Sequence, residues 1–300
     1  MNKHLFKGLC LIMGWYMTIQ NSLAQVAPIQ NQAYFNPYIN NPAWVGNQEV
    51  SQLFIGFKKQ WLGVNGSPTL ANLTFEHPLG TTNASVGLKI TNITEGPINS
   101  FSGQATAGYR LEVGMESFLF FGMSLGIAYN LFDANKLDDP DDPLAIEQNG
   151  SNAAFDGGVG VGYRTGKFQA GWAIPRFVVP GPFLKPNDAQ DTFSPWDYMI
   201  GSLAYTYEIN LDWSLTPRLF YHYYKDFQNL ASLGLEASYQ KKYLGGVIWQ
   251  QYNGITLFGG MDLSNYLNIR YLYSFSAPAS DLPNDSHEIT LSIRFGEAKK

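Results

Sequence analysis

The sequence has little charge, a single cysteine and no long apolar run after its amino terminus, and each shortage narrows the class of protein. Only 14% of its 300 residues are charged, against about 25% in a typical soluble domain. In contrast, 45% are hydrophobic, 15% are aromatic and 30 residues are glycine. This balance is typical of a transmembrane β-barrel, whose strands alternate instead of forming long apolar stretches. A soluble β-sandwich is the alternative that composition leaves open.

The first 24 residues predict a secretory signal peptide. An apolar run, Leu9–Ile19, follows Lys3 and Lys7 and ends in small residues, so we expect cleavage after Ala24. Cys10 lies inside this run, and disulfides therefore play no part in the stability of the mature chain. Cleavage removes two of the 19 basic residues, which leaves 17 against 24 acidic residues and a net charge of −7. This charge gives no basic footprint for nucleic acid.

The stretch Phe118–Phe132 shows the alternation on which the fold prediction depends. Its odd-numbered positions from 119 to 129 are large and apolar: Leu119, Phe121, Met123, Leu125, Ile127 and Tyr129. Its even-numbered positions from 122 to 128 are small: Gly122, Ser124, Gly126 and Ala128. Successive side chains of a strand point to opposite faces, so the pattern predicts a strand with one large apolar face. The run is too short and too rich in glycine for a membrane helix.

Fourteen alternating segments follow one another after residue 50. They lie near 51–60, 69–77, 83–92, 101–111, 116–132, 153–165, 167–174, 196–209, 211–224, 230–240, 242–252, 254–264, 266–276 and 286–295. We therefore predict an all-β protein, a transmembrane antiparallel β-barrel of about fourteen strands. Its predicted parts are a signal peptide (1–24), an irregular periplasmic leader or plug (25–50), the barrel (51–296) and a polar tail (297–300).

The predicted connections between strands differ systematically in length. Every second link is short, and the long links, 61–68, 93–100, 133–152, 175–195 and 277–285, all fall at the other parity. Outer-membrane barrels have short periplasmic turns and longer outer loops, whereas a sandwich has no reason to sort its loops. Aromatic residues near the predicted strand ends, among them Tyr198, Trp213, Tyr224 and Trp249, are typical of an interfacial girdle.

No stretch of the sequence predicts catalysis, a cofactor or a metal site. The run Gly157–Gly162 leads into a second strand, not the helix that a phosphate-binding loop needs, so small residues on one strand face explain it better. The acidic loop 133–152 lacks the ligand spacing of a calcium loop. Ser286-His287-Glu288 supplies no strained nucleophile, and an outer-membrane hydrolase is a remote alternative. We expect a non-enzymatic protein.

Two motifs carry a resemblance to a known family. Asn36-Pro37, then Asn41-Pro42-Ala43 and Gly46, resembles the opening of the PorP/SprF family of type IX secretion-associated membrane proteins. Lys59-Gln60-Trp61, with Gly63, Gly66, Pro68 and Thr69, resembles its second segment. Glu76-Pro78-Leu79, Asp156–Gly160 and Ser286–Glu288 follow in the expected order. Two positions, Trp44 and Asn92, depart from the family pattern, and Trp44 leaves the local contacts of the leader open.

The resemblance implies a protein of the outer membrane of a Gram-negative-type bacterium, reached after Sec-type export. Similar proteins act as adaptors between secreted cargo, such as gliding adhesins, and periplasmic ring or lipoprotein components of the secretion system. Outer-membrane lipids would surround the barrel. The alternative is a diffusion porin or hydrophobic-solute channel with the leader as its plug.

Ten residues of the two motifs are candidate partner-binding residues. They are Asn36, Pro37, Asn41, Pro42, Ala43, Trp44, Gln60, Trp61, Gly66 and Pro68. An Asn-Pro-rich leader is preorganised and loses less conformational entropy when it binds a partner. The same leader could instead plug or strap the lumen, and Trp61 could pack under its own loop.

Overall fold

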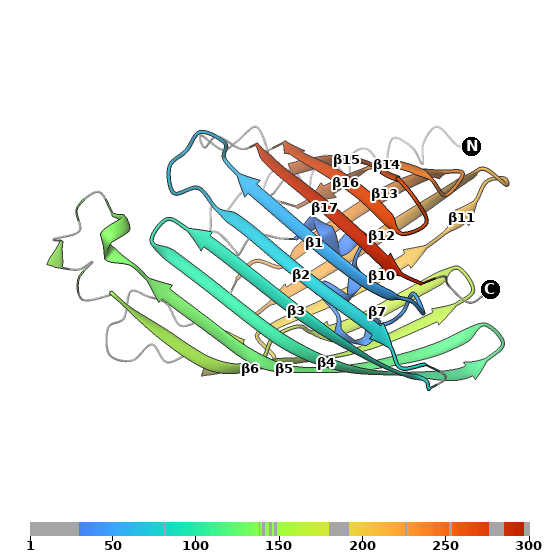
Figure 1. The fold of residues 1–300 in the computed structure, drawn as a ribbon, viewed down its shortest axis with the longest axis horizontal. Helices are drawn as coiled ribbons and strands as arrows, with labels where there is room; N and C mark the ends of the chain where they lie inside the picture. Colours follow the sequence, from blue (N-terminus) through green and yellow to red (C-terminus); the bar gives the residue numbers. More distant parts are fainter. Residues whose placement is uncertain are drawn as a thin grey trace, which may run out of the picture.

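The structure is a computed structural model that describes residues 30–80, 82–137, 139, 142–143, 146, 149–179, 192–225, 227–251, 254–275 and 285–296. Within these ranges, fourteen antiparallel strands form one closed barrel (Figure 1). The first strand pairs with the last, and β10 pairs with β12, so the sheet closes into a ring. The predicted all-β barrel is confirmed. The predicted signal peptide and the polar tail lie outside the described residues.

The strand boundaries follow the predicted segments closely. The wall consists of β1 (Ser51–Gln60), β2 (Thr69–Pro78), β3 (Ala84–Glu95), β4 (Ile98–Gly114), β5 (Ser117–Phe132), β6 (Gly150–Thr165), β7 (Phe168–Ile174), β10 (Tyr198–Tyr205), β12 (Trp213–Tyr224), β13 (Leu230–Tyr239), β14 (Tyr243–Gln250), β15 (Gly254–Asp262), β16 (Leu267–Phe275) and β17 (Ser286–Phe295). β11 (Tyr207–Glu208) extends β10 along β12, and β8 (Val178–Val179) and β9 (Thr192–Phe193) form a separate pair. The 3-10 helix η5 (Ala134–Lys136) follows β5. None of the helices in the described ranges is long and apolar enough to cross a membrane.

The barrel has apolar side chains outside and polar side chains inside. On β5, Leu125 is 58% exposed on the outer face, whereas its neighbour Ser124 is fully buried in the lumen. The lumenal face also buries charged and amide side chains, including Glu76, Lys89 and Asp156. A soluble sandwich packs apolar faces inward, and this arrangement is the reverse, because the surroundings of the barrel are lipid.

The two mouths of the barrel differ, as the loop lengths predict. Short turns lie at the mouth where β1 begins and β17 ends, and the loops 61–68, 133–149 and 175–197 lie at the other mouth. One long link was predicted wrongly. Residues 93–100 mostly belong to β3 and β4, which meet in a turn at Gly96-Pro97. Gly96 has a φ of 56°, a conformation that glycine adopts without strain. β4, β5 and β6 therefore extend beyond the shorter strands at the long-loop mouth (Figure 1).

The lipid-facing orientation of β15 gives a stability prediction. We expect Leu257→Arg, near the middle of the strand, to lower the free energy of unfolding in lipid by about 2–4 kcal/mol, since it places a charge in hydrocarbon. Met261→Arg, on the same face near the short-turn mouth, should cost about 0–1 kcal/mol. Denaturant unfolding in lipid vesicles measures both values, and equal losses would contradict the membrane placement.

Candidate functional site

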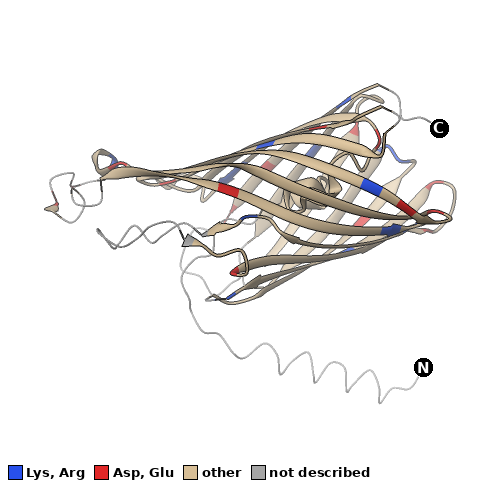
Figure 2. Cartoon of the chain, turned by 90° about the horizontal axis from the view of Figure 1, so that it is seen from below, with Lys and Arg blue, Asp and Glu red and all other residues tan. Residues whose placement is uncertain are grey.

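The leader lies inside the barrel and forms short helical turns. Its described residues fold into the 3-10 helices η2 (Asn31–Tyr34), η3 (Pro37–Ile39) and η4 (Pro42–Trp44). Pro37 and Pro42 each begin a helix, where the fixed φ of proline is favourable and its missing N–H costs nothing. The side chain of Asn41 caps η4 by accepting a hydrogen bond from the N–H of Ala43 at 2.9 Å. Figure 2 shows a helical turn of this segment in the space that the strands enclose.

The beginning of the leader is held near the long-loop mouth. The amide of Gln250, the last residue of β14, donates to Asn31 Oδ1 at 2.9 Å. The backbone N–H of Gln32 donates to Glu288 at 2.8 Å, near the start of β17. The hydroxyls of Tyr34 and Ser232 lie 2.8 Å apart, near the start of β13.

The middle of the leader contacts the opposite wall. The side-chain amide of Asn36 donates to Thr74 on β2 at 2.7 Å, and the Tyr38 hydroxyl donates to Thr106 on β4 at 2.7 Å. The Asn41 amide donates to the carbonyl of Val161 on β6 at 3.1 Å. Together with the contacts of η2, these bonds tie the leader to strands all around the barrel.

The end of the leader is held at the short-turn mouth. The N–H of Gly46 donates to the Glu76 carboxylate at 2.7 Å. Arg164 donates to Asn47 Oδ1 at 2.7 Å, and Arg110 forms an ion pair with Glu49. Both guanidinium groups also lie over the ring of Phe118, with Cζ 5.2–5.3 Å from its centre, an arrangement that favours a cation over an aromatic face.

Glycines on the inward faces of the strands make room for the leader. A Cβ at Gly122 would collide with the backbone of Pro42, and one at Gly162 would lie 3.0 Å from the Trp44 ring. Gly234 gives the same room to the Tyr34 ring. The small inward face predicted for Phe118–Phe132, and the glycines near residue 160, thus have a common physical reason. The sequence shows the small face but not its occupant.

The leader residues predicted to bind partners are buried in the lumen. Asn36, Asn41, Pro42, Ala43 and Trp44 are all buried, and Pro37 is half-buried. The predicted irregular conformation is confirmed. The predicted periplasmic location is not what the structure shows, because the described leader fills the lumen as a plug would. Contact with a partner would require the leader to move, and partner binding by these residues stays a prediction.

The remaining candidates lie in the first loop of the long-loop mouth. The N–H of Gln60 donates to the Pro68 carbonyl at 3.0 Å, and that of Trp61 donates to the Asp285 carbonyl at 2.8 Å. Gly66 accepts a hydrogen bond from the N–H of Gly96 at 2.8 Å. Gln60 and Trp61 are half-buried, Gly66 is exposed and Pro68 is buried. Their role in partner binding also stays a prediction.

The tip of this loop carries two exposed apolar residues that the sequence reading missed. Leu62 is 56% exposed and Val64 is 39% exposed, more than Trp61 beside them. Apolar residues in a loop directed away from the membrane are candidates for protein contact. Their position beside the Trp61 motif was the available signal.

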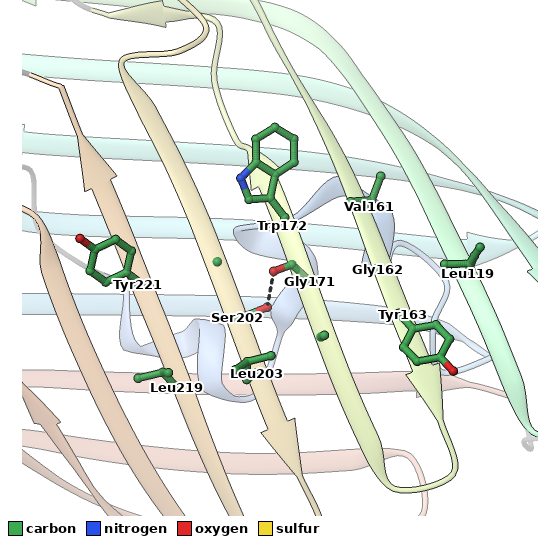
Figure 3. A pocket seen from close by; sticks show the side chains of 12 residues that line it. Leu119, Val161, Gly162, Tyr163, Gly171, Trp172, Ser202, Leu203, Leu219 and Tyr221 are labelled. Carbon is green, nitrogen blue, oxygen red and sulfur yellow. Dashed lines mark hydrogen bonds between the residues drawn. The ribbon is translucent and has the colours of Figure 1, made fainter.

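A groove of about 410 Å³ marks the outer wall across β5, β6, β7, β10 and β12 (Figure 3). Leu119, Trp172, Leu203 and Tyr221 stand around it, and small residues such as Gly201 keep its floor low. Because this face is turned to lipid, hydrocarbon chains are the surroundings that fit the groove.

Two of the predicted girdle aromatics point inward instead. The rings of Tyr198 and Tyr224 stack in the lumen with centres 4.6 Å apart, and Tyr198 Oη lies 3.0 Å from His222 Nδ1. They pack above the leader cluster that contains Tyr34. In the part of the chain that the structure describes, no group of three or more His, Cys, Asp or Glu side chains is arranged to hold a metal ion.

Comparison with known proteins identifies relatives by family and by fold. Residues 22–293 match the model of a family described as type IX secretion system membrane protein PorP/SprF. No curated protein matches the sequence. The fold is similar to that of the CymD monoaromatic hydrocarbon channel, with a TM-score of 0.54, 14% identity, and 92% of this chain and 96% of that chain covered. It is also similar to a FadL homologue of Pseudomonas aeruginosa, with a TM-score of 0.50, 11% identity, and 89% and 94% covered. At these identities the likeness shows the barrel fold.

The close approach of leader and wall gives a second prediction. We expect Gly122→Val to lower the free energy of unfolding by about 1–3 kcal/mol, because the added side chain meets the leader backbone and has no space to occupy. The matched change Gly201→Val adds the same atoms to a glycine with open space around it and should change stability by less than about 0.5 kcal/mol. Denaturant unfolding of both variants in detergent is the measurement. A similar loss in both would show that the leader does not fill the space opposite Gly122.

Proposed function

The chain belongs to the family of type IX secretion system membrane proteins PorP/SprF, and from this membership we propose that it is a non-enzymatic adaptor of the outer membrane. In this proposal it contacts secreted or surface-anchored cargo, such as a gliding adhesin, on one side. It contacts periplasmic ring or lipoprotein components of the secretion system on the other. The residues that carry these contacts lie at the two mouths of the barrel.

The observation that carries the proposal is the occupied lumen. Hydrogen bonds from β2, β4, β6, β13, β14 and β17 hold the leader across the barrel. Aromatic clusters add to this attachment, since Tyr34 packs against Phe220 and Trp44 packs against Phe120. A barrel whose interior is filled in this way offers its rims, and not its lumen, for work on large partners.

Each rim has a surface suited to protein contact. At the long-loop mouth, the exposed pair Leu62 and Val64 supplies apolar area of the kind that forms the centre of an interface. At the short-turn mouth, a cavity of about 470 Å³ opens beside the leader, between Val45, Ser85 and Arg110. Its mixed apolar and polar lining favours a polypeptide segment over a lipid.

The alternative function is a channel in which the leader acts as a plug. The placement of the leader in the lumen favours this second candidate, because removal of a lumenal segment would open a path. The two candidates differ in one requirement. A channel needs the leader to move, whereas an adaptor that uses its rims does not.

A disulfide between leader and wall tests this requirement. The mature chain has no cysteine of its own, so Val45→Cys with Gly108→Cys would supply the single available pair. A Cβ at Gly108 would lie against the Val45 side chain, which is close enough for a bridge. We expect the oxidised protein to co-purify with its secretion partners as well as the reduced protein does.

The matched controls are the two single-cysteine variants, which cannot form the bridge. Conductance in planar bilayers is measured on the same samples. Conductance that appears only after reduction, with partner capture unaffected by either state, would favour the channel. Loss of partner capture on oxidation would contradict the use of the rims, because it would mean that the leader itself must move.

The exposed loop tip gives a further prediction. We expect the double change Leu62→Ser and Val64→Ser to weaken capture of the secreted cargo by about tenfold or more, because it removes the apolar centre of the proposed contact. Val113→Ser, an equally exposed apolar position near the short-turn mouth, serves as the control and should leave cargo capture unchanged. Unchanged capture in the double variant would exclude the loop tip as the contact.

A further inference from the structure

The leader has a definite direction through the barrel. Its first described helix, η2, contacts Gln250 at the end of β14 and Glu288 near the start of β17, and both positions adjoin links of the long-loop mouth. Its last residues, Asn47 and Glu49, contact Arg164 and Arg110 near the short-turn ends of β6 and β4. The leader therefore runs the length of the lumen from one mouth to the other.

The chemistry of the barrel fixes which mouth faces outward. In outer-membrane barrels the short turns are periplasmic and the long loops lie outside the cell. The first strand also begins and the last strand ends at the short-turn mouth. The described leader thus begins near the outer mouth and ends at the periplasmic mouth, where it continues into β1.

We propose that the amino terminus of the mature protein lies at the outer mouth of the barrel and is accessible from outside the cell. Cleavage after Ala24 would leave five residues, 25–29, before Gln30. Five residues span at most about 17 Å when fully extended. A bilayer core is about 30 Å thick, so these residues are too short to return from the outer end of the lumen to the periplasm.

The occupied lumen supports the same conclusion. A return path would have to pass the side chains of Tyr38 and Trp44, which are buried against the wall. On the other side, Gln30 is half-buried and its side chain contacts Asn72 at 3.4 Å, near the outer half of β2. The short path for the preceding residues leads outward.

This topology has a consequence for assembly and for partners. The leader begins on one side of the membrane and continues into β1 on the other, and β1 closes the ring by pairing with β17. The barrel must therefore close around the leader, since threading a folded barrel afterwards would require the leader to pass lengthwise through its own contacts. In the finished protein, a single segment presents its start to surface partners and its end to periplasmic ones.

Cysteine accessibility in intact cells tests the proposal. We would introduce Ala27→Cys into the full-length protein, whose mature form has no other thiol, and treat cells with a maleimide–polyethylene glycol reagent too large to cross the outer membrane. Asn65→Cys, in the exposed outer loop, is the positive control. Met115→Cys, 96% exposed in a short turn, is the periplasmic control. Heat-modifiable migration confirms that each variant has folded.

We expect Ala27→Cys to be labelled in intact cells to the same extent as Asn65→Cys, while Met115→Cys is labelled only after the outer membrane is opened. Labelling of Ala27→Cys that follows the periplasmic control would overturn the proposal. Labelling only after denaturation would overturn it as well, because the terminus would then be enclosed. If Ala27→Cys does not fold, Val26→Cys gives the same reading from the neighbouring position.

Discussion

The structure depends on one constraint, which is that no backbone N–H or C=O can remain unpaired in hydrocarbon. A sheet satisfies this condition when its edges are joined, and here β1 and β17 join along ten residue pairs, from Ser51↔Phe295 to Gln60↔Ser286. Closure places one face of every strand in lipid and the other in a shared interior. The apolar outer face and the polar lumen both follow from it, as does the low content of charged residues.

A closed barrel of this kind needs something to occupy its interior, and the leader meets that need. It presents backbone donors to buried carboxylates at Glu288 and Glu76 and aromatic rings to glycine-lined parts of the wall. Its short 3-10 helices, started by prolines, suit a segment that must reach many strands in turn and cannot pair with any of them as a strand. The wall and the leader are therefore complementary along their whole contact, which a loosely tethered peptide would not require.

The sequence predicted the wall well because each strand carries its own evidence. Alternation such as that of Leu125 and Ser124 depends on local geometry alone, and loop lengths record the two sides of a membrane. The location of the leader was not predictable in the same way, because its contacts join residues far apart in the chain, such as Asn31 and Gln250. Composition cannot show which strand an Asn-Pro segment will meet. The exceptions among the strands have the same origin, since Tyr198 and Tyr224 follow the inward parity of their strands and not the general preference of aromatics for interfaces.

The threaded leader also limits how partners can use the barrel. A hinged plug could swing aside at one mouth, but a segment attached at both ends of the lumen must break its contacts in sequence to leave. Those contacts include two buried carboxylates and a pair of arginines stacked over Phe118, and removal of either partner from such a contact leaves a buried group without compensation. A large energetic barrier to leaving favours a leader that stays in place while partners meet the rims. It also explains why a protein of a secretion system can have a barrel without using the lumen of that barrel as the path.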